Sequence, residues 1–181
     1  MRPALLLPAA VLALSACGTL SAAPQGQPAT AQDAQDTLPE GAVLSAQSGS
    51  KLSDATARAR VTAAGISVRS SGNCSTRSVS TCTSLEGVNS GTIDGIITLK
   101  KASGCALTIT GGTEVGHASG TYSHSNGYKL DISKTNCIGG YITSAFTRTA
   151  TRGDGAPQYQ SAAGNIYADE SWANHWDILY Y

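Results

Sequence analysis

The chain has 181 residues, enough for one ordinary domain with a single core. Its formal net charge is zero, only 13% of its residues are charged, and Lys and Arg are scattered along the sequence. A nucleic-acid-binding surface needs clustered positive charge, so we expect no nucleic-acid partner. The many Gly, Ser and Thr residues favour a loop-rich domain with a sheet over a helical bundle.

Residues 1–17 have the pattern of a bacterial lipoprotein signal peptide. Arg2 supplies a positive charge, Leu5–Leu14 is apolar but too short to span a bilayer, and Leu14-Ser15-Ala16-Cys17 resembles a lipobox. In a lipobox the Cys becomes lipid-modified and forms the mature N-terminus. We therefore expect an exported lipoprotein of the bacterial cell envelope, attached to the membrane only through acyl chains on Cys17. The alternative is an ordinary signal peptide that leaves Cys17 unmodified.

Residues 18–52 and 53–181 differ in composition. The first segment consists mainly of Ala, Gln, Ser, Pro, Gly and Thr, and it has too few large apolar side chains to offset the entropy lost on ordering. We expect this segment to be a disordered tether. It would connect the anchor to one domain formed by residues 53–181.

Two helices are expected in the first half of that domain. Ser53-Asp54 is a helix N-cap signal before an Ala- and Arg-rich stretch, which Gly65 ends. Thr83-Ser84 is a second cap candidate. It precedes apolar residues at roughly helical spacing, from Leu85 to Leu99, and this pattern stops at Gly104.

Strands are expected between and after these helices. The β-prone stretches are 66–69, 106–110, 128–132, 138–146, 158–167 and 175–181. In the last stretch, alternation places His175, Asp177 and Leu179 on one face. The sequence thus predicts an α+β fold with a small, mostly antiparallel sheet and one or two packed helices.

Of the five cysteines, four fall inside the predicted domain. Their number is even and disulfides persist in an exported protein, so we expect two bridges. Of the three possible pairings we favour Cys74 with Cys82, which closes a short loop, and Cys105 with Cys137, which joins the start of a strand to a later segment. A four-thiolate zinc site is the alternative, but the sequence has no Cys-x-x-Cys spacing.

The densest group of potential metal ligands lies in residues 111–131. His124 comes just before a turn at Asn126-Gly127, and Asp131 lies on the strand that leaves the turn, so the imidazole can fold back towards the carboxylate. His175 on the terminal strand would add a third ligand if that strand lay beside the strand of Asp131. Two imidazoles and one carboxylate leave one position for water, which is the arrangement of a catalytic zinc site.

The motif Ser123-His124-x-x-Gly127-x-x-x-Asp131 resembles the signature of zinc D-Ala-D-Ala carboxypeptidases, phage endolysin peptidases and the hedgehog signalling domain, in which the His and Asp bind zinc. In that family a third His lies in a late strand, after a Glu that acts as general base. The region Asp169-Glu170-Ser-Trp-Ala-Asn-His175-Trp-Asp is similar. The resemblance covers the bulk of the predicted domain and implies the family's fold, with Zn2+ held by His124, Asp131 and His175.

The resemblance also implies a reaction. Glu170, five residues before His175, is our choice of general base, and Asp169, six before, matches the spacing of hedgehog-like members. Zinc would lower the pKa of its water towards about 7 and polarise the scissile carbonyl, while the base would carry a proton to the leaving amine. The implied partner is a peptidoglycan stem peptide, cut by a monomeric carboxypeptidase or endopeptidase.

Three further residues near the motif are candidate substrate contacts: Ser123, His117 and Glu114. His117 lies in a Gly- and Ser-rich loop, where it is either a solvated side chain or one that supports the ligands or contacts substrate. Glu114 would either cap the loop or touch the zinc water. The segment that ends at Glu114 stands where the family carries a substrate-binding Arg.

Two other functions are compatible with the same residues. One is a non-catalytic lipoprotein that contains zinc for stability, or keeps only the fold, and binds the cell wall without cutting it. The other is a structural lipoprotein without a metal, whose His and Asp side chains only hydrogen-bond within a loop. A fourth protein ligand in the open position would favour the non-catalytic protein, whereas a base about 3 Å from the water would favour the enzyme.

Overall fold

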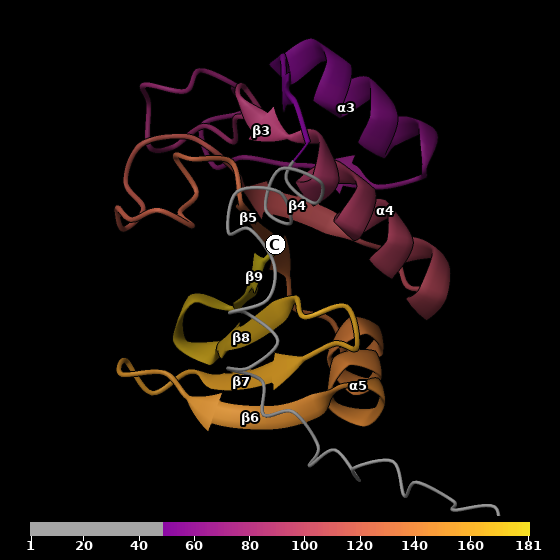
Figure 1. Cartoon of the computed structure of the whole chain (residues 1–181). Coiled ribbons are helices and arrows are strands. Elements are labelled where there is room, and N and C mark those ends of the chain that lie inside the picture. Colours follow the sequence, from indigo (N-terminus) through magenta and orange to yellow (C-terminus); the bar gives the residue numbers. More distant parts are fainter. Residues whose placement is uncertain (1–48) are drawn as a thin grey trace, which may run out of the picture. The chain divides into compact units, whose positions relative to one another are not determined.

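The computed structural model describes residues 49–181, which form an α+β fold (Figure 1). The predictions for the signal peptide at 1–17, the lipidated Cys17 and most of the tether lie outside the described residues. Among the helices that are described, none combines the length and apolar character that crossing a membrane requires.

The α-helices of the described part are α3 (Asp54–Ala63), α4 (Ser90–Ser103) and α5 (Asn136–Ala145). Helix α3 begins as predicted, because Ser53 Oγ accepts a hydrogen bond from the backbone N–H of Thr56 at 3.3 Å. Helix α4 ends as predicted at Gly104, whose φ of 66° is left-handed. It begins later than predicted, with Asn89 as its N-cap.

Helix α5 corrects the strand that we predicted at 138–146. The hydroxyl of its N-cap Thr135 accepts a hydrogen bond from the backbone N–H of Ile138 at 3.3 Å. Ile138 and Ile142, one helical turn apart, are both fully buried in the core. The β-branched residues of this stretch predict a strand, but the buried face at helical spacing outweighs that propensity.

The larger sheet has the strand order β2-β4-β5-β9-β8-β7-β6. Its strands are β2 (Ser67–Val68), β4 (Thr108–Gly111), β5 (Lys129–Ser133), β6 (Thr147–Thr151), β7 (Pro157–Gln160), β8 (Ile166–Glu170) and β9 (His175–Leu179). All neighbours pair antiparallel except β2 with β4, so the predicted mostly antiparallel α+β fold is confirmed. A separate antiparallel pair consists of β1 (Lys51–Leu52) and β3 (Val88–Asn89).

The terminal strand β9 lies between β5 and β8, in the interior of the sheet (Figure 1). The register places Asp131 of β5 opposite Asp177 of β9, and Ser133 opposite His175. On the other side of β9, His175 lies opposite Glu170, the last residue of β8. The last strand of the chain therefore brings distant parts of the sequence together.

The core lies against the opposite face of these strands. Its fully buried side chains from the sheet alternate with the residues named above, and helices α4 and α5 cover them. The main members are Ile93, Ile96, Leu130, Ile132, Ile138, Ile142, Trp176 and Ile178. Burial of large apolar side chains on one face fixes which residues of β5, β8 and β9 point to the other face.

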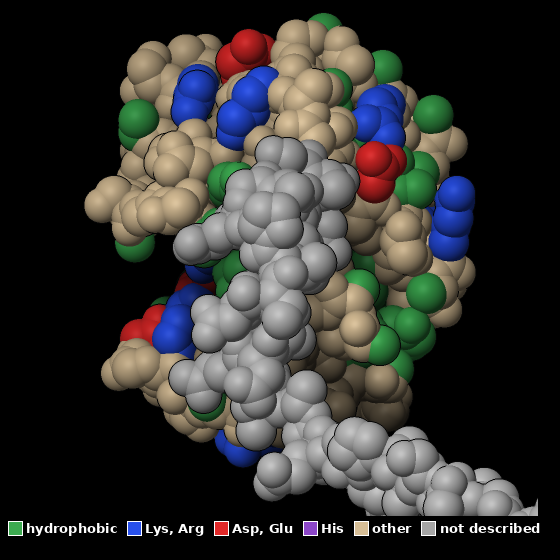
Figure 2. Space-filling model, viewed as in Figure 1, with side chains coloured by type: hydrophobic (Ala, Val, Ile, Leu, Met, Phe, Trp, Pro, Cys, Tyr) green, Lys and Arg blue, Asp and Glu red, His purple; other side chains and the backbone are tan. Residues whose placement is uncertain are grey.

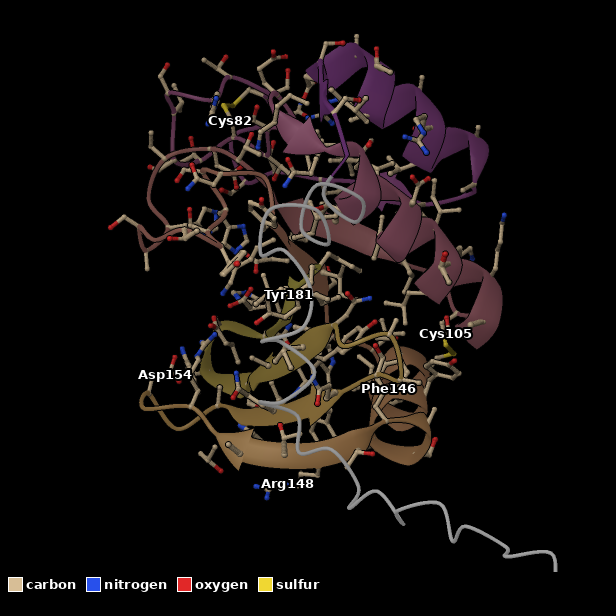
Figure 3. All side chains as sticks on the ribbon, in the orientation of Figure 1. Cys82, Cys105, Phe146, Arg148, Asp154 and Tyr181 are labelled. Carbon is tan, nitrogen blue, oxygen red and sulfur yellow. A yellow bond between two sulfur atoms is a disulfide. The ribbon has the colours of Figure 1, made fainter. Side chains whose placement is uncertain are left out.

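Both favoured disulfides are confirmed. Cys74–Cys82 closes a loop of sequence separation 8, and Cys105–Cys137 spans a separation of 32. The second bridge joins the residue after Gly104 to the first turn of α5 (Figure 3). By restricting the unfolded chain, the two bridges would contribute about 3 and about 4 kcal/mol to stability.

Candidate metal centre

One face of the central strands carries titratable side chains. Paired residues of neighbouring strands point to the same face, and the register pairs Asp131 with Asp177, and His175 with both Ser133 and Glu170. Strands β5, β8 and β9 therefore place two aspartates, a glutamate and a histidine side by side. The sequence motifs are brought together by strand pairing and not by local geometry.

His124 reaches this face from the loop between β4 and β5. Its side chain is buried, and its Nδ1 lies 2.8 Å from the carbonyl oxygen of Gly112. A carbonyl oxygen can only accept, so Nδ1 donates and Nε2 is the nitrogen left for other partners. Nε2 lies 3.4 Å from Asp131 Oδ1 and 3.5 Å from Asp177 Oδ1.

His175, at the start of β9, lies near the same oxygen. Its Nε2 lies 3.7 Å from Asp131 Oδ1 and 2.7 Å from Glu170 Oε2. Asp131 Oδ1 is buried and has no hydrogen-bond partner among the described residues. A buried carboxylate oxygen without a partner is unfavourable, and a cation between it and the two imidazoles would remove that cost. The two predicted imidazole ligands, His124 and His175, thus both approach the carboxylate of Asp131.

A third imidazole, that of His117, lies near Oδ2, the other oxygen of the Asp131 carboxylate. His117 Nδ1 is 3.8 Å from Asp131 Oδ2. His117, His124 and Asp131 each offer a ligand atom within 4.8 Å of the others, so these three residues could hold a metal ion. We predicted His117 as a solvated side chain, or as one that supports the ligands or contacts substrate, and not as a ligand. The signal for a ligand role was a second His seven residues before His124 in the same Gly-rich segment.

The orientation of the rings distinguishes His117 from His175. The His117 and His124 rings are stacked, with centroids 3.8 Å apart and planes 15° apart. A zinc ion binds an imidazole nitrogen at about 2.0–2.1 Å, close to the plane of the ring. Two nearly parallel stacked rings cannot both meet this condition for one ion unless one ring turns. His124 and His175 both approach Asp131 Oδ1 through Nε2, at 3.4 and 3.7 Å, and His175 Nε2 would have to release Glu170 Oε2, 2.7 Å away, to bind an ion.

Glu114 holds the loop in place. Its buried carboxylate accepts hydrogen bonds from the backbone N–H of Ser84 at 2.7 Å and of Gly112 at 3.1 Å, and it lies 3.1 Å from His117 Nε2. Burial alone would raise the pKa of Glu114, but these hydrogen bonds outweigh it and hold the pKa below its ordinary value. Of the two roles that we considered, the contacts favour the loop cap.

Asp177 and Arg152 also belong to the centre, and neither was among the predicted site residues, although strand alternation had placed Asp177 on the face of His175. Asp177 Oδ2 accepts hydrogen bonds from Lys129 Nζ at 2.6 Å and Arg152 Nη1 at 2.7 Å, while its Oδ1 is buried without a hydrogen-bond partner among the described residues. Arg152 also forms an ion pair with Glu170. It comes from the turn between β6 and β7, a polar stretch whose side chains reach the centre only through strand order.

The electrostatics of the centre favour a cation at His124. Burial alone would lower the pKa of His124, but the carboxylates of Asp131 and Asp177 raise it to about 9. For Asp177, burial would raise the pKa, but His124 and Lys129 outweigh it and hold the pKa far below its ordinary value. These buried groups therefore attract positive charge, whether a proton or a metal ion supplies it.

The two candidate bases lie on different faces of the sheet. Glu170 pairs with His175 in the register, whereas Asp169 pairs with Trp176 of the core face. Asp169 Oδ1 accepts hydrogen bonds from Lys134 Nζ at 2.5 Å and Ser171 Oγ at 2.6 Å. Asp169 therefore points away from the metal ligands, and Glu170 is the carboxylate that faces them.

Ser123, the first residue of the motif, stabilises the turn that carries His124. Its buried hydroxyl lies 3.0 Å from Ser125 Oγ and accepts a hydrogen bond from the backbone N–H of Asn126 at 3.3 Å. These contacts are local to the turn. We therefore assign Ser123 a part in positioning His124.

A pocket of about 380 Å³ opens onto this centre. Asp131, His117, His175 and Glu114 are among the residues that line it. The lining also carries hydroxyl groups from residues in or beside the Cys74–Cys82 loop and from β4 and β5. Those residues are Ser71, Ser80, Thr81, Thr83, Thr110 and Ser133. The volume lies within the range of small-ligand sites.

Comparison with known proteins found no relatives of this chain. No protein-family model, no curated protein and no solved structure matches it. The assignment of a function therefore depends on the residues of the centre and on the motifs in the sequence.

Proposed function

We propose that this chain is an exported, lipid-anchored zinc peptidase that acts on peptidoglycan stem peptides of the bacterial cell envelope. The observation that carries the proposal is the approach of His124 Nε2 and His175 Nε2, at 3.4 and 3.7 Å, to the unpartnered oxygen Oδ1 of Asp131. Two imidazoles and one carboxylate are a ligand set that zinc prefers, and they leave a position for a reactant.

Each residue then has a chemical task. When bound, zinc supplies a Lewis acid that polarises the scissile carbonyl and acidifies the attacking water. Glu170 Oε2 lies 2.7 Å from His175 Nε2, the nitrogen that would bind zinc, so the carboxylate would border the reaction position. We assign Glu170 the transfer of a proton from the water to the leaving amine. Arg152 holds the other oxygen of Glu170 and so fixes its orientation.

The pocket and the N-terminal motif support the choice of substrate and location. Hydroxyl groups both donate and accept, so the walls suit the N–H and C=O groups of a peptide. A lipid anchor at Cys17 would hold the domain in the compartment that contains peptidoglycan. The resemblance of the His124 and Asp131 motif to the D-Ala-D-Ala carboxypeptidase family supports the same substrate class.

A second candidate is a zinc-containing lipoprotein that binds the cell wall without cutting it. The observation in its favour is His117, whose Nδ1 lies 3.8 Å from Asp131 Oδ2. If the His117 ring turned, it would occupy the fourth position and close the site. The two candidates differ in the number of protein ligands and in turnover.

One experiment separates these functions. The protein is purified without chelator, its metal content is measured, and purified sacculi are digested with and without chelator before mass analysis of the released fragments. We expect about one zinc ion per chain, with peptide fragments that disappear on chelation and return when zinc is added. Bound zinc without fragments would favour the second candidate. Protein without metal would contradict both.

A further inference from the structure

The proposed active site has an excess of negative charge. Four carboxylates lie against the imidazoles, a fifth pairs with Arg152, and two cations accompany them. The carboxylates are those of Glu114, Asp131, Asp154, Glu170 and Asp177, and the cations are Lys129 and Arg152. With the imidazoles neutral, as metal ligands would be, three negative charges remain, and a divalent metal ion would neutralise two. Figure 2 shows a few Lys, Arg, Asp and Glu side chains scattered over the visible face.

Neither cation is free to bind a substrate carboxylate. Lys129 Nζ donates to Asp177 Oδ2 at 2.6 Å. Arg152 donates to Asp177 Oδ2 at 2.7 Å and to Asp154 Oδ2 at 2.6 Å, and it also pairs with Glu170. The tip of the β6–β7 turn, where Asp154 is labelled in Figure 3, thus supplies a carboxylate for its own arginine. Each positive charge is already committed to the protein.

The substrate pocket itself offers no replacement. Within residues 49–181, its lining contains neither Lys nor Arg. It does contain the carboxylates of Glu114 and Asp131. A carboxylate that moved from water into this pocket would lose hydration and gain no cation, except the metal that the scissile carbonyl also needs.

On the basis of the proposed function, we infer that the enzyme is an endopeptidase: it cuts bonds inside stem peptides, next to neutral or amine-bearing residues. Removal of a C-terminal residue would place a free carboxylate within one residue of the cut, or about 3.3–3.6 Å along an extended chain. That carboxylate would lie in the negative field of Asp131 and Glu170. An internal bond presents only amides there, and a nearby amine would be attracted.

Two matched peptides test the inference. Both carry the same stem-peptide sequence, one with a free C-terminal carboxylate and the other with a C-terminal amide. With the zinc-loaded protein we expect kcat/KM to be higher for the amide by about tenfold or more, because one like-charge contact near a partly buried site has this order of effect. Equal or faster cleavage of the free acid would overturn the inference.

Binding gives a second measurement that does not depend on turnover. Chelator-treated wild-type protein retains all five carboxylates, and calorimetric titration with each peptide compares the two affinities. We expect the amide to bind more tightly. Tighter or equal binding of the free acid, or binding of neither peptide, would overturn the inference. If the amide binds better but zinc-loaded protein cuts neither peptide, the proposed peptidase function fails while the inferred ligand class stands.

A charge added to the pocket wall tests the physical cause. Ser80 is an exposed residue of the lining, and Ser80→Arg places a cation there, whereas Ser80→Gln adds a neutral side chain as the control for size. Ser80→Arg should reduce the preference for the amide several-fold relative to Ser80→Gln. Identical preferences in the two variants would show that charge does not set the specificity.

Discussion

The two faces of strands β5 and β9 are built on opposite principles. On one face Leu130, Ile132, Trp176 and Ile178 are buried in an apolar core. On the other, Asp131 lies directly opposite Asp177 in the register. Directly opposed like charges destabilise a strand pair, whereas apolar pairs stabilise it.

This difference shows how the fold supports the site. The core face supplies the free energy that holds β9 between β5 and β8. The charged face uses that rigidity, because Asp131 and Asp177 stay together only while the register is fixed. Lys129 and Arg152 offset part of the repulsion, and the unpartnered oxygens Oδ1 of both aspartates point to a further cation.

The largest expected effect is on metal binding and compares three imidazoles. His175→Ala and His124→Ala should each abolish zinc binding, because each removes a nitrogen that approaches Asp131 Oδ1. His117→Ala is the control, and it should keep the metal with a loss in affinity of about 10- to 100-fold at most. Zinc titration against a competing chelator measures all three. Retention of zinc by His175→Ala together with its loss in His117→Ala would reverse the assignment.

The next effect is on turnover and compares the two acidic neighbours on β8. Glu170→Gln should keep zinc and lower kcat by about 10²- to 10⁴-fold, because it removes the proton acceptor. Asp169→Asn is the matched control on the core-side face, where Lys134 and Ser171 hold the carboxylate. Fragment release from sacculi is the assay. Full activity of Glu170→Gln would move the base elsewhere.

A smaller effect on stability tests the core face. Ile132→Ala removes a fully buried side chain and should lower the free energy of unfolding by about 3 kcal/mol. Ser133→Ala, one residue further on the opposite face, should change it by less than about 0.5 kcal/mol. Denaturant titration of chelator-treated protein measures both. Similar losses would mean that the charged face contributes as much stability as the core.

The smallest effect is the acid sensitivity of the loop that carries His124. The pKa of Glu114 is lower in the folded protein than its ordinary value of 4.5, so its contribution to stability is present above pH 4.5 and is lost as the pH falls through the folded pKa. Glu114→Gln should lower stability at pH 7 by about 1–2 kcal/mol and show a weaker decline in acid. Melting temperatures from pH 3 to 7 test this. Parallel pH profiles for wild type and variant would contradict it.

The sequence predicted the parts of the molecule that local signals determine. The cap at Ser53, the end of α4 at Gly104 and the strand that carries Asp131 all have such signals, and the structure agrees. The prediction for α5 was wrong, because the β-branched residues of this stretch favour a strand. In the structure Ile138 and Ile142 bury one helical face against the core, and this burial favours the helix. The fully exposed β6 was missed, since its Thr-rich sequence has no apolar alternation.

The site residues also divide into those that a local motif identifies and those that only the arrangement of strands brings in. His124 and Asp131 share a turn and a fixed spacing, so a motif in the sequence identifies them. Arg152 and Asp177 contribute through the order of strands in the sheet, and no spacing along the chain reveals this order. Adjacent residues of β8 point to opposite faces, and the register with β9 decides which of them faces the site. It pairs Glu170 with His175 and Asp169 with Trp176 of the core.

A crystal structure of the zinc-loaded protein tests the central claim most directly. We predict one ion bound by His124 Nε2, a carboxylate oxygen of Asp131 and His175 Nε2, with each bond about 2.0–2.2 Å long, and with His117 still paired to Glu114. An ion bound by His117 in place of His175, or zinc found only elsewhere on the protein, would contradict the account.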